Sequence, residues 1–102
     1  MNHKFKFDHN SYKWQVNDYE YNCMFARELI RYLMDEFENR GYLYLNQIYE
    51  MFGIKWNPDN ENSVIRYYEY YRNVETPLFC FNEDENKNCV HIMIDAYYEG
   101  DS

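Results

Sequence analysis

Two cysteines and a histidine near the C-terminal end are the residues best suited to chemistry. Cys80, Cys89 and His91 offer thiol and imidazole groups, which zinc prefers as ligands in proteins. If their segments form a hairpin, Cys80 and Cys89 could face each other, which would allow a zinc ion or a cross-strand disulfide. The sequence has no Cys-x-x-Cys spacing and no fourth ligand nearby, so it favours two buried thiols and a packed or exposed imidazole. We therefore expect no metal at these residues.

Other reactive groups lack the neighbours that catalysis needs. Cys23 lies on the apolar stripe of a predicted helix, where a core thiol is expected. The carboxylate pairs Asp35 with Glu38 and Asp59 with Glu61 show no sign of a pocket that would separate their pKa values. With three glycines in the chain, there is little material for a phosphate-binding loop. The sequence therefore predicts a protein that is not an enzyme and holds no cofactor.

A cluster of tyrosines between residues 67 and 71 indicates a surface for a partner. Neighbouring side chains diverge in a helix and in a strand, so these rings cannot all enter one core. Exposed Tyr gives a large contact area at low entropic cost. The alternative is that the rings only line the boundary of a small core. We predict these partner-binding residues, the last three on a charged loop: Tyr67, Tyr68, Glu69, Tyr70, Tyr71, Glu83, Asp84 and Glu85.

The N-terminal half contains the strongest structural pattern. A long amphipathic helix is predicted from Asp18 to Asn39, with Asn17 as its N-cap and Gly41 as its C-terminal cap. Apolar residues recur along it at three- and four-residue steps: Cys23, Ala26, Ile30, Leu33 and Phe37. Before it, Lys4 to Asp8 alternates as an edge strand would, although it could also be a loose arm.

Shorter elements follow. Tyr42 to Leu45 indicates a short strand that leads into a helix from Gln47 to Phe52, capped by Asn46. Leu78 to Phe81 and Cys89 to Tyr98 look like two strands joined by a polar loop.

The segment Ser63 to Arg72 is ambiguous. Charges recur every three residues and favour a helix, while five β-prone residues favour a strand, and we prefer the helix. The predicted fold class is α+β, with a long N-terminal amphipathic helix, a short strand, one or two further helices and a C-terminal β-hairpin. This order of elements is winged-helix-like. Residues 1–102 are expected to form a single domain, in which residues 1–16 are the edge strand or loose arm.

The charge of the chain points to the chemistry of its partner. The net charge is −8, and because residues 1–16 carry +2, the remainder carries −10. Such a field repels phosphate backbones and attracts a protein with a basic surface. No apolar run approaches the roughly 20 residues of a membrane-spanning helix. The three cysteines lack the spacing of a disulfide framework, so we expect a cytoplasmic protein with no membrane partner.

Two segments of the sequence resemble a pattern found in other small proteins. Arg40 to Trp56, RGYLYLNQIYEMFGIKW, resembles a recurrent pattern in small proteins of Gram-positive prophages and other mobile elements. In that pattern a Gly-Tyr step ends a helix, a short strand leads to a capped helix, and Trp follows. Val90 to Tyr97 resembles their closing apolar strand, whereas Asn57 to Thr76 is longer than the pattern and rich in tyrosine. Such proteins generally have no assigned activity. The resemblance implies an accessory role, often the binding of a host or element protein, and some such proteins inhibit host defence complexes.

Two functions of different classes follow. The first is a non-enzymatic acidic protein-binding module, an accessory protein of a mobile element that inhibits a host nucleic-acid-binding defence complex by acidic mimicry. The second is a winged-helix DNA-binding transcriptional regulator that would place Ser63 to Arg72 in the major groove. The acidic charge opposes binding to nucleic acid and favours the first function.

Overall fold

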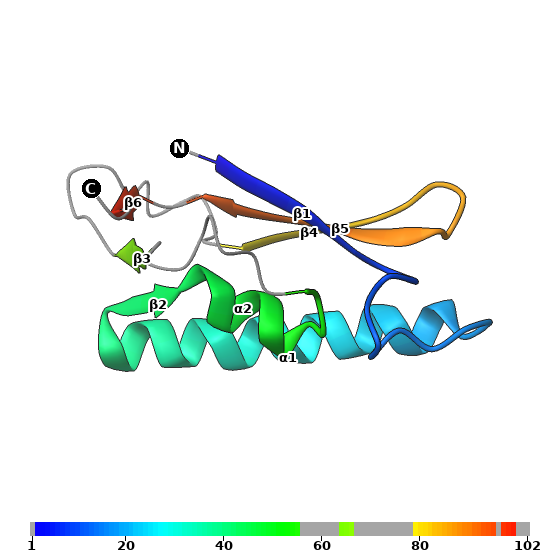
Figure 1. Cartoon of the computed structure of the whole chain (residues 1–102), viewed down its shortest axis with the longest axis horizontal. Coiled ribbons are helices and arrows are strands. Elements are labelled where there is room, and N and C mark those ends of the chain that lie inside the picture. Colours follow the sequence, from blue (N-terminus) through cyan, green and yellow to red (C-terminus); the bar gives the residue numbers. More distant parts are fainter. Residues whose placement is uncertain (1, 56–63, 67–78, 96, 100–102) are drawn as a thin grey trace.

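The chain folds as an α+β protein, as the sequence predicts. The computed structural model describes residues 2–55, 64–66, 79–95 and 97–99. In chain order the elements are β1 (Asn2–Asp8), α1 (Tyr19–Arg40), β2 (Tyr42–Tyr44), α2 (Leu45–Met51), β3 (Val64–Arg66), β4 (Phe79–Glu83), β5 (Cys89–Asp95) and β6 (Tyr97–Glu99). Figure 1 shows the strands β1, β5 and β4 in a layer that runs along α1.

The strands form two small antiparallel sheets. One has the order β1-β5-β4 and the other the order β2-β3-β6. In the first sheet Phe7 of β1 lies opposite Val90 of β5, and Phe81 of β4 lies opposite Ile92. Residues 2–8 therefore form a strand at the edge of this sheet and not a loose arm.

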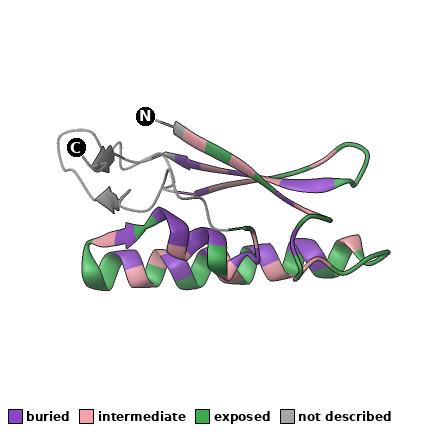
Figure 2. Cartoon of the chain, viewed as in Figure 1, coloured by how far each residue is buried: buried purple, intermediate pink, exposed green. Residues whose placement is uncertain are grey.

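The core lies between the β1-β5-β4 sheet and the helices. Alternate residues of the strands are buried: Phe7, Phe79, Val90, Ile92 and Ile94. The facing stripe of α1 is buried as well: Cys23, Ala26, Ile30, Leu33 and Phe37. In Figure 2 these buried stretches turn toward each other, while the side of α1 away from the sheet is exposed. Burial of a large apolar side chain contributes roughly 1.5–3 kcal/mol, so this interface is the main source of stability.

The ends of α1 differ in part from the prediction. The N-cap is Asp18, whose carboxylate accepts a hydrogen bond from the backbone N–H of Tyr21 at 3.1 Å. The prediction of Asn17 is wrong, because Asn17 has a φ of 65° whereas an N-cap needs extended backbone. Gly41 has a φ of 80° and donates its N–H to the carbonyl of Phe37 at 2.7 Å, which is the predicted C-terminal cap.

The second helix begins earlier than predicted. α2 starts at Leu45, directly after β2, and its N-cap Tyr44 makes no side-chain capping hydrogen bond. Asn46 therefore lies inside the first turn, where it is buried, and its prediction as the cap is wrong. Leu45 and Ile48 are both buried, so core packing places the start of this helix.

The helix favoured for Ser63 to Arg72 is wrong over the residues that the structure describes. Val64–Arg66 is the strand β3, which pairs with β2 on one side and β6 on the other. Val and Ile are β-branched and suit a strand, and pairing on both sides offers partners to its backbone polar groups. Residues 67–72 of the prediction lie outside the described residues.

Within the described ranges, no helix is both long enough and apolar enough to cross a membrane. α1 has 22 residues but carries charged side chains along its exposed side.

Candidate functional site

The loop between β4 and β5 is organised by its first residue. The carbonyl of Asp84 accepts the N–H of Lys87 at 3.0 Å, and Asp84 Oδ2 accepts the N–H of Asn88, also at 3.0 Å. Lys87 adopts a φ of 59°, which lets the chain turn back into β5. Asp residues favour turns because their side chains bond the backbone that follows. The carboxylate of Asp84 is consequently fixed close to the start of β5.

Tyr19 ties this loop to the start of α1. Its hydroxyl accepts the N–H of Asp84 at 2.8 Å and donates to the carbonyl of Cys89 at 2.8 Å. Burial raises the pKa of Tyr19 to about 12, so the phenol remains protonated and keeps the proton that it donates. A single side chain therefore holds both ends of the loop.

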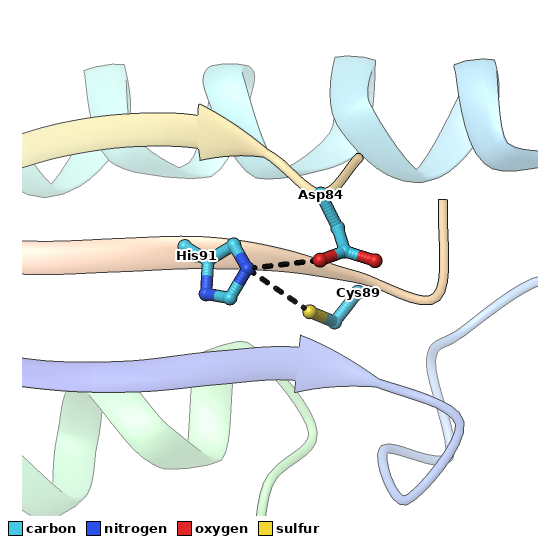
Figure 3. A group of neighbouring side chains, drawn as sticks. All are labelled: Asp84, Cys89 and His91. Carbon is cyan, nitrogen blue, oxygen red and sulfur yellow. Dashed lines mark hydrogen bonds and ion pairs between the residues drawn. The ribbon is translucent and has the colours of Figure 1, made fainter. Parts of the chain in front are cut away.

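Three possible metal ligands meet at the base of this loop (Figure 3). His91 Nε2 lies 3.2 Å from Asp84 Oδ1 and 3.5 Å from Cys89 Sγ. One ligand atom from each of the three residues lies within 4.8 Å of the others. Cys89 is buried, whereas the side chains of His91 and Asp84 are 43% and 21% exposed. The cluster thus combines a thiol, an imidazole and a carboxylate at a place that solvent reaches.

Cys80 does not belong to this cluster. The prediction that Cys80 and Cys89 could face each other across a hairpin is therefore wrong. The register places Cys80 opposite Met93, and places Cys89 opposite Asp8 of β1. The reason is that β4 continues to Glu83, so the loop spans only residues 84–88 and the pairs are shifted. All three cysteines are free thiols. Asp84, predicted as a partner-binding residue, takes the position beside His91.

The electrostatics of the cluster oppose a cysteine nucleophile. Burial raises the pKa of Cys89, and the charge of Asp84 raises it further. Hydrogen bonds from the backbone of Asn88 and from His91 lower the pKa of Asp84. A catalytic triad uses the two different nitrogens of its histidine, whereas Asp84 and Cys89 both contact Nε2. The cluster is therefore not arranged as a Cys-His-Asp catalytic triad.

The predicted partner-binding residues divide into two groups. Tyr67, Tyr68, Glu69, Tyr70 and Tyr71 lie outside the described residues. Glu83 and Glu85 are exposed at the loop, and Asp84 is half-buried. Glu83 also accepts a hydrogen bond from the thiol of Cys23 at 3.4 Å. The loop therefore presents acidic groups, although Asp84 is already held by its neighbours.

A second acidic surface lies on α1, on the side away from the sheet. We define the outer face of α1 by six residues: Tyr21, Met24, Phe25, Glu28, Tyr32 and Asp35. Tyr21, Met24 and Tyr32 are 40%, 55% and 51% exposed. A shallow hollow of about 290 Å³ lies between this face and Met51 of α2. The face combines large contact groups with two carboxylates, and the ammonium group of Lys13 lies at its edge, 6.0 Å from the centre of the Phe25 ring.

Basic residues border the outer face and also lie on the sheet. Arg31 pairs with Glu28 at 3.6 Å from the flank of the outer face, and both side chains are largely exposed. Such pairs contribute about 0–1 kcal/mol, so Glu28 remains available to a partner. Lys4 and Lys6 are exposed on the sheet, beside His91, where they line a groove of about 490 Å³.

The sequence analysis missed the outer face as a contact surface. The sequence patterns considered above gave no role to Tyr21 or Tyr32. The available signal was that Tyr21, Phe25 and Tyr32 recur at helical spacing outside the apolar stripe.

Comparison of the chain with protein-family models, with curated proteins and with solved structures finds no match.

Proposed function

We propose that the protein is a non-enzymatic protein-binding module, and that the outer face of α1 docks on a basic surface of a protein partner. The observation that carries this proposal is the composition of that face, which joins exposed Tyr21, Met24 and Tyr32 to the carboxylates of Glu28 and Asp35. The net charge of −8 acts in the same direction.

Each part of the face supplies a different contribution. Tyr and Met give large contact areas, and Tyr does so with little loss of conformational entropy. Carboxylates steer a basic partner and raise its association rate more than its final affinity. A partner recruited in this way associates more slowly, and so binds less tightly, as salt screens the charges, over a Debye length of about 8 Å at physiological ionic strength.

The more specific form of the proposal concerns the identity of the partner. The partner is a nucleic-acid-binding protein of a host defence complex, and the carboxylates stand in for phosphates in its basic groove. The exposed acids Glu83 and Glu85, at the loop between β4 and β5, are proposed to add negative charge, and Tyr67 to Tyr71 are proposed to add contacts. The support for this form is the acidic charge together with the resemblance to small proteins of Gram-positive prophages and other mobile elements.

We do not extend the proposal to DNA binding by a winged helix. That function would need a recognition helix within residues 63–72, where Val64–Arg66 is a strand. A winged-helix protein would also contact phosphates with its hairpin, and this hairpin exposes Glu83 and Glu85, whose negative charge repels phosphate.

Affinity capture at two salt concentrations tests the proposal. The tagged protein is incubated with lysate of a Gram-positive host, and the bound proteins are identified by mass spectrometry. We expect a specific basic protein that is retained at low salt and released as the ionic strength rises. A bait with Tyr21→Ser and Tyr32→Ser should lose it, whereas Tyr12→Ser, at an exposed tyrosine outside the outer face, should retain it. Retention that ignores both salt and the paired substitutions would refute the proposal.

A further inference from the structure

We infer that Asp84, Cys89 and His91 form a binding site for a zinc ion. This site is separate from the outer face of α1, since it lies at the base of the loop between β4 and β5 (Figure 3). The inference does not depend on the proposed protein partner.

Two of the three separations between the ligand atoms fit tetrahedral zinc. Zinc bonds of about 2.3 Å to sulfur and about 2.0–2.1 Å to nitrogen or oxygen imply an N···S separation of about 3.5 Å and an N···O separation of about 3.3 Å. The corresponding distances from His91 Nε2 are 3.5 Å to Cys89 Sγ and 3.2 Å to Asp84 Oδ1. The remaining pair, sulfur and oxygen, lies within 4.8 Å. Tetrahedral zinc implies about 3.5 Å for this pair, so zinc binding requires the thiol of Cys89 and the carboxylate of Asp84 to approach each other by up to about 1.3 Å.

The approach of two side chains to the same nitrogen of His91 also favours a bound cation. Oδ1 of Asp84 and Sγ of Cys89 both approach Nε2 of His91. A neutral imidazole nitrogen either donates one proton or accepts one, so it cannot serve both neighbours with a well-aligned hydrogen bond. A metal ion at the centre of the three atoms is bound by all of them at once.

The donor set selects the type of metal. A thiolate disfavours magnesium and calcium, which bind oxygen ligands, and imidazole with thiolate suits zinc. On binding, Cys89 releases its thiol proton to solvent. One thiolate and one carboxylate then balance the charge of Zn²⁺. Three protein ligands leave the fourth tetrahedral position for water or another small ligand.

Outer partners hold the ligands in place. Asp84 Oδ2 is bonded to the N–H of Asn88, which leaves Oδ1 directed at His91. Tyr19 fixes the backbone of both Asp84 and Cys89. Outer partners of this kind commonly change metal affinity by about 10–100-fold. The partly exposed side chains of His91 and Asp84 give the ion a path from solvent.

Metal titration of the full chain tests the inference. Protein stripped with a chelator and kept reduced is titrated with zinc by calorimetry, and with cobalt by absorbance. We expect one equivalent of zinc, and a thiolate-to-cobalt charge-transfer band with the visible bands of tetrahedral cobalt. Cys89→Ser and Asp84→Asn should each weaken zinc binding by more than about 100-fold, the upper loss seen for outer partners. The matched control is Cys80→Ser, which changes a half-buried thiol outside the cluster and should leave binding intact.

Each other outcome overturns the inference. Absence of stoichiometric zinc binding by the folded wild-type chain does so, with folding monitored by circular dichroism. Binding that survives both Cys89→Ser and Asp84→Asn would assign the metal to other residues. Binding lost in Cys80→Ser but kept in Cys89→Ser would do the same. Asp84→Asn keeps the test decisive if Cys89→Ser fails to fold, because Asp84 is not part of the buried core.

Discussion

The hydroxyl of Tyr19 donates a hydrogen bond of 2.8 Å to the backbone carbonyl of Cys89, which joins the first residue of α1 to the first residue of β5. The same hydroxyl accepts the N–H of Asp84 at 2.8 Å. The base of the loop, where the proposed zinc ligands meet, is therefore attached to the helix that carries the outer face.

Tyr19→Phe should destabilise the fold, because it leaves the N–H of Asp84 and the carbonyl of Cys89 without this partner. The loss of a hydrogen bond in a partly buried place costs about 0.5–1.5 kcal/mol. Chemical denaturation monitored by circular dichroism measures the change. Tyr32→Phe removes the hydroxyl of a half-exposed ring and should alter the free energy of unfolding by less than about 0.5 kcal/mol. Equal effects of the two substitutions would show that the attachment contributes nothing.

The same tyrosine should make stability depend on alkaline pH. Burial raises the pKa of Tyr19 from 10.0 to about 12, so the unfolded chain loses this proton at a lower pH than the folded one. Its contribution to stability is therefore complete below pH 10 and declines as the pH rises toward 12. The difference in unfolding free energy between wild type and Tyr19→Phe should shrink over that window. A difference that stays constant from pH 9 to pH 12 would contradict the raised pKa.

His3 should affect stability at acidic pH in the opposite direction. Its ring packs near Phe5 and Tyr49, and burial lowers the pKa of His3 below 6.5. The unfolded chain therefore takes up the proton first, so the contribution of His3 is complete above pH 6.5 and is lost as the pH falls through the lowered value. The stability advantage of wild type over His3→Asn should decrease below pH 6.5. Denaturation curves at several pH values check this, and an advantage that grows on acidification would refute it.

The two glycines with positive φ should differ in their tolerance of alanine. Gly53 has a φ of 72°, and a Cβ there would lie 2.6 Å from Ser11 Oγ and 2.9 Å from Lys13 Cγ. Gly41 has a φ of 80°, but nothing lies within 4 Å of its added Cβ. Gly41→Ala should therefore cost only the backbone strain, about 1–2 kcal/mol. Gly53→Ala should cost more, because it also displaces the Ser11 hydroxyl that donates to the carbonyl of Phe52. Comparable melting temperatures for the two variants would contradict this account.

The local pattern of the sequence is sufficient for much of α1. Cys23, Ala26, Ile30 and Leu33 are buried where the helical spacing places them, since a period of 3.6 residues is a property of one segment alone. The choice of Asp18 over Asn17 as the N-cap was not predictable from this pattern, because Asn and Asp both favour the position. Asn17 has a positive φ, which an N-cap does not adopt, so Asp18 is the N-cap.

The candidate site depends on relations that the sequence does not contain. Whether Cys89 meets Cys80 or Asp84 depends on where the β4 strand ends, and the predicted loop of residues 82–88 is two residues too long at that end. A shift of this size changes every cross-strand neighbour. The outer face was missed for another reason. Tyr and Met are compatible with both core and surface, and only the fold shows which rings are exposed.

The most direct test of the central proposal is a binding titration with the captured partner. Dissociation constants are measured for wild type and two doubly substituted chains that lose the same charge, Glu28→Gln with Asp35→Asn on the outer face, and Glu20→Gln with Glu38→Gln beside it. All four residues are exposed on α1. The account predicts that the outer-face pair weakens binding at least about tenfold, which corresponds to about 1.4 kcal/mol, and reduces the salt dependence, while the other pair has a smaller effect. Equal losses for the two pairs would contradict a partner docked on the outer face of α1.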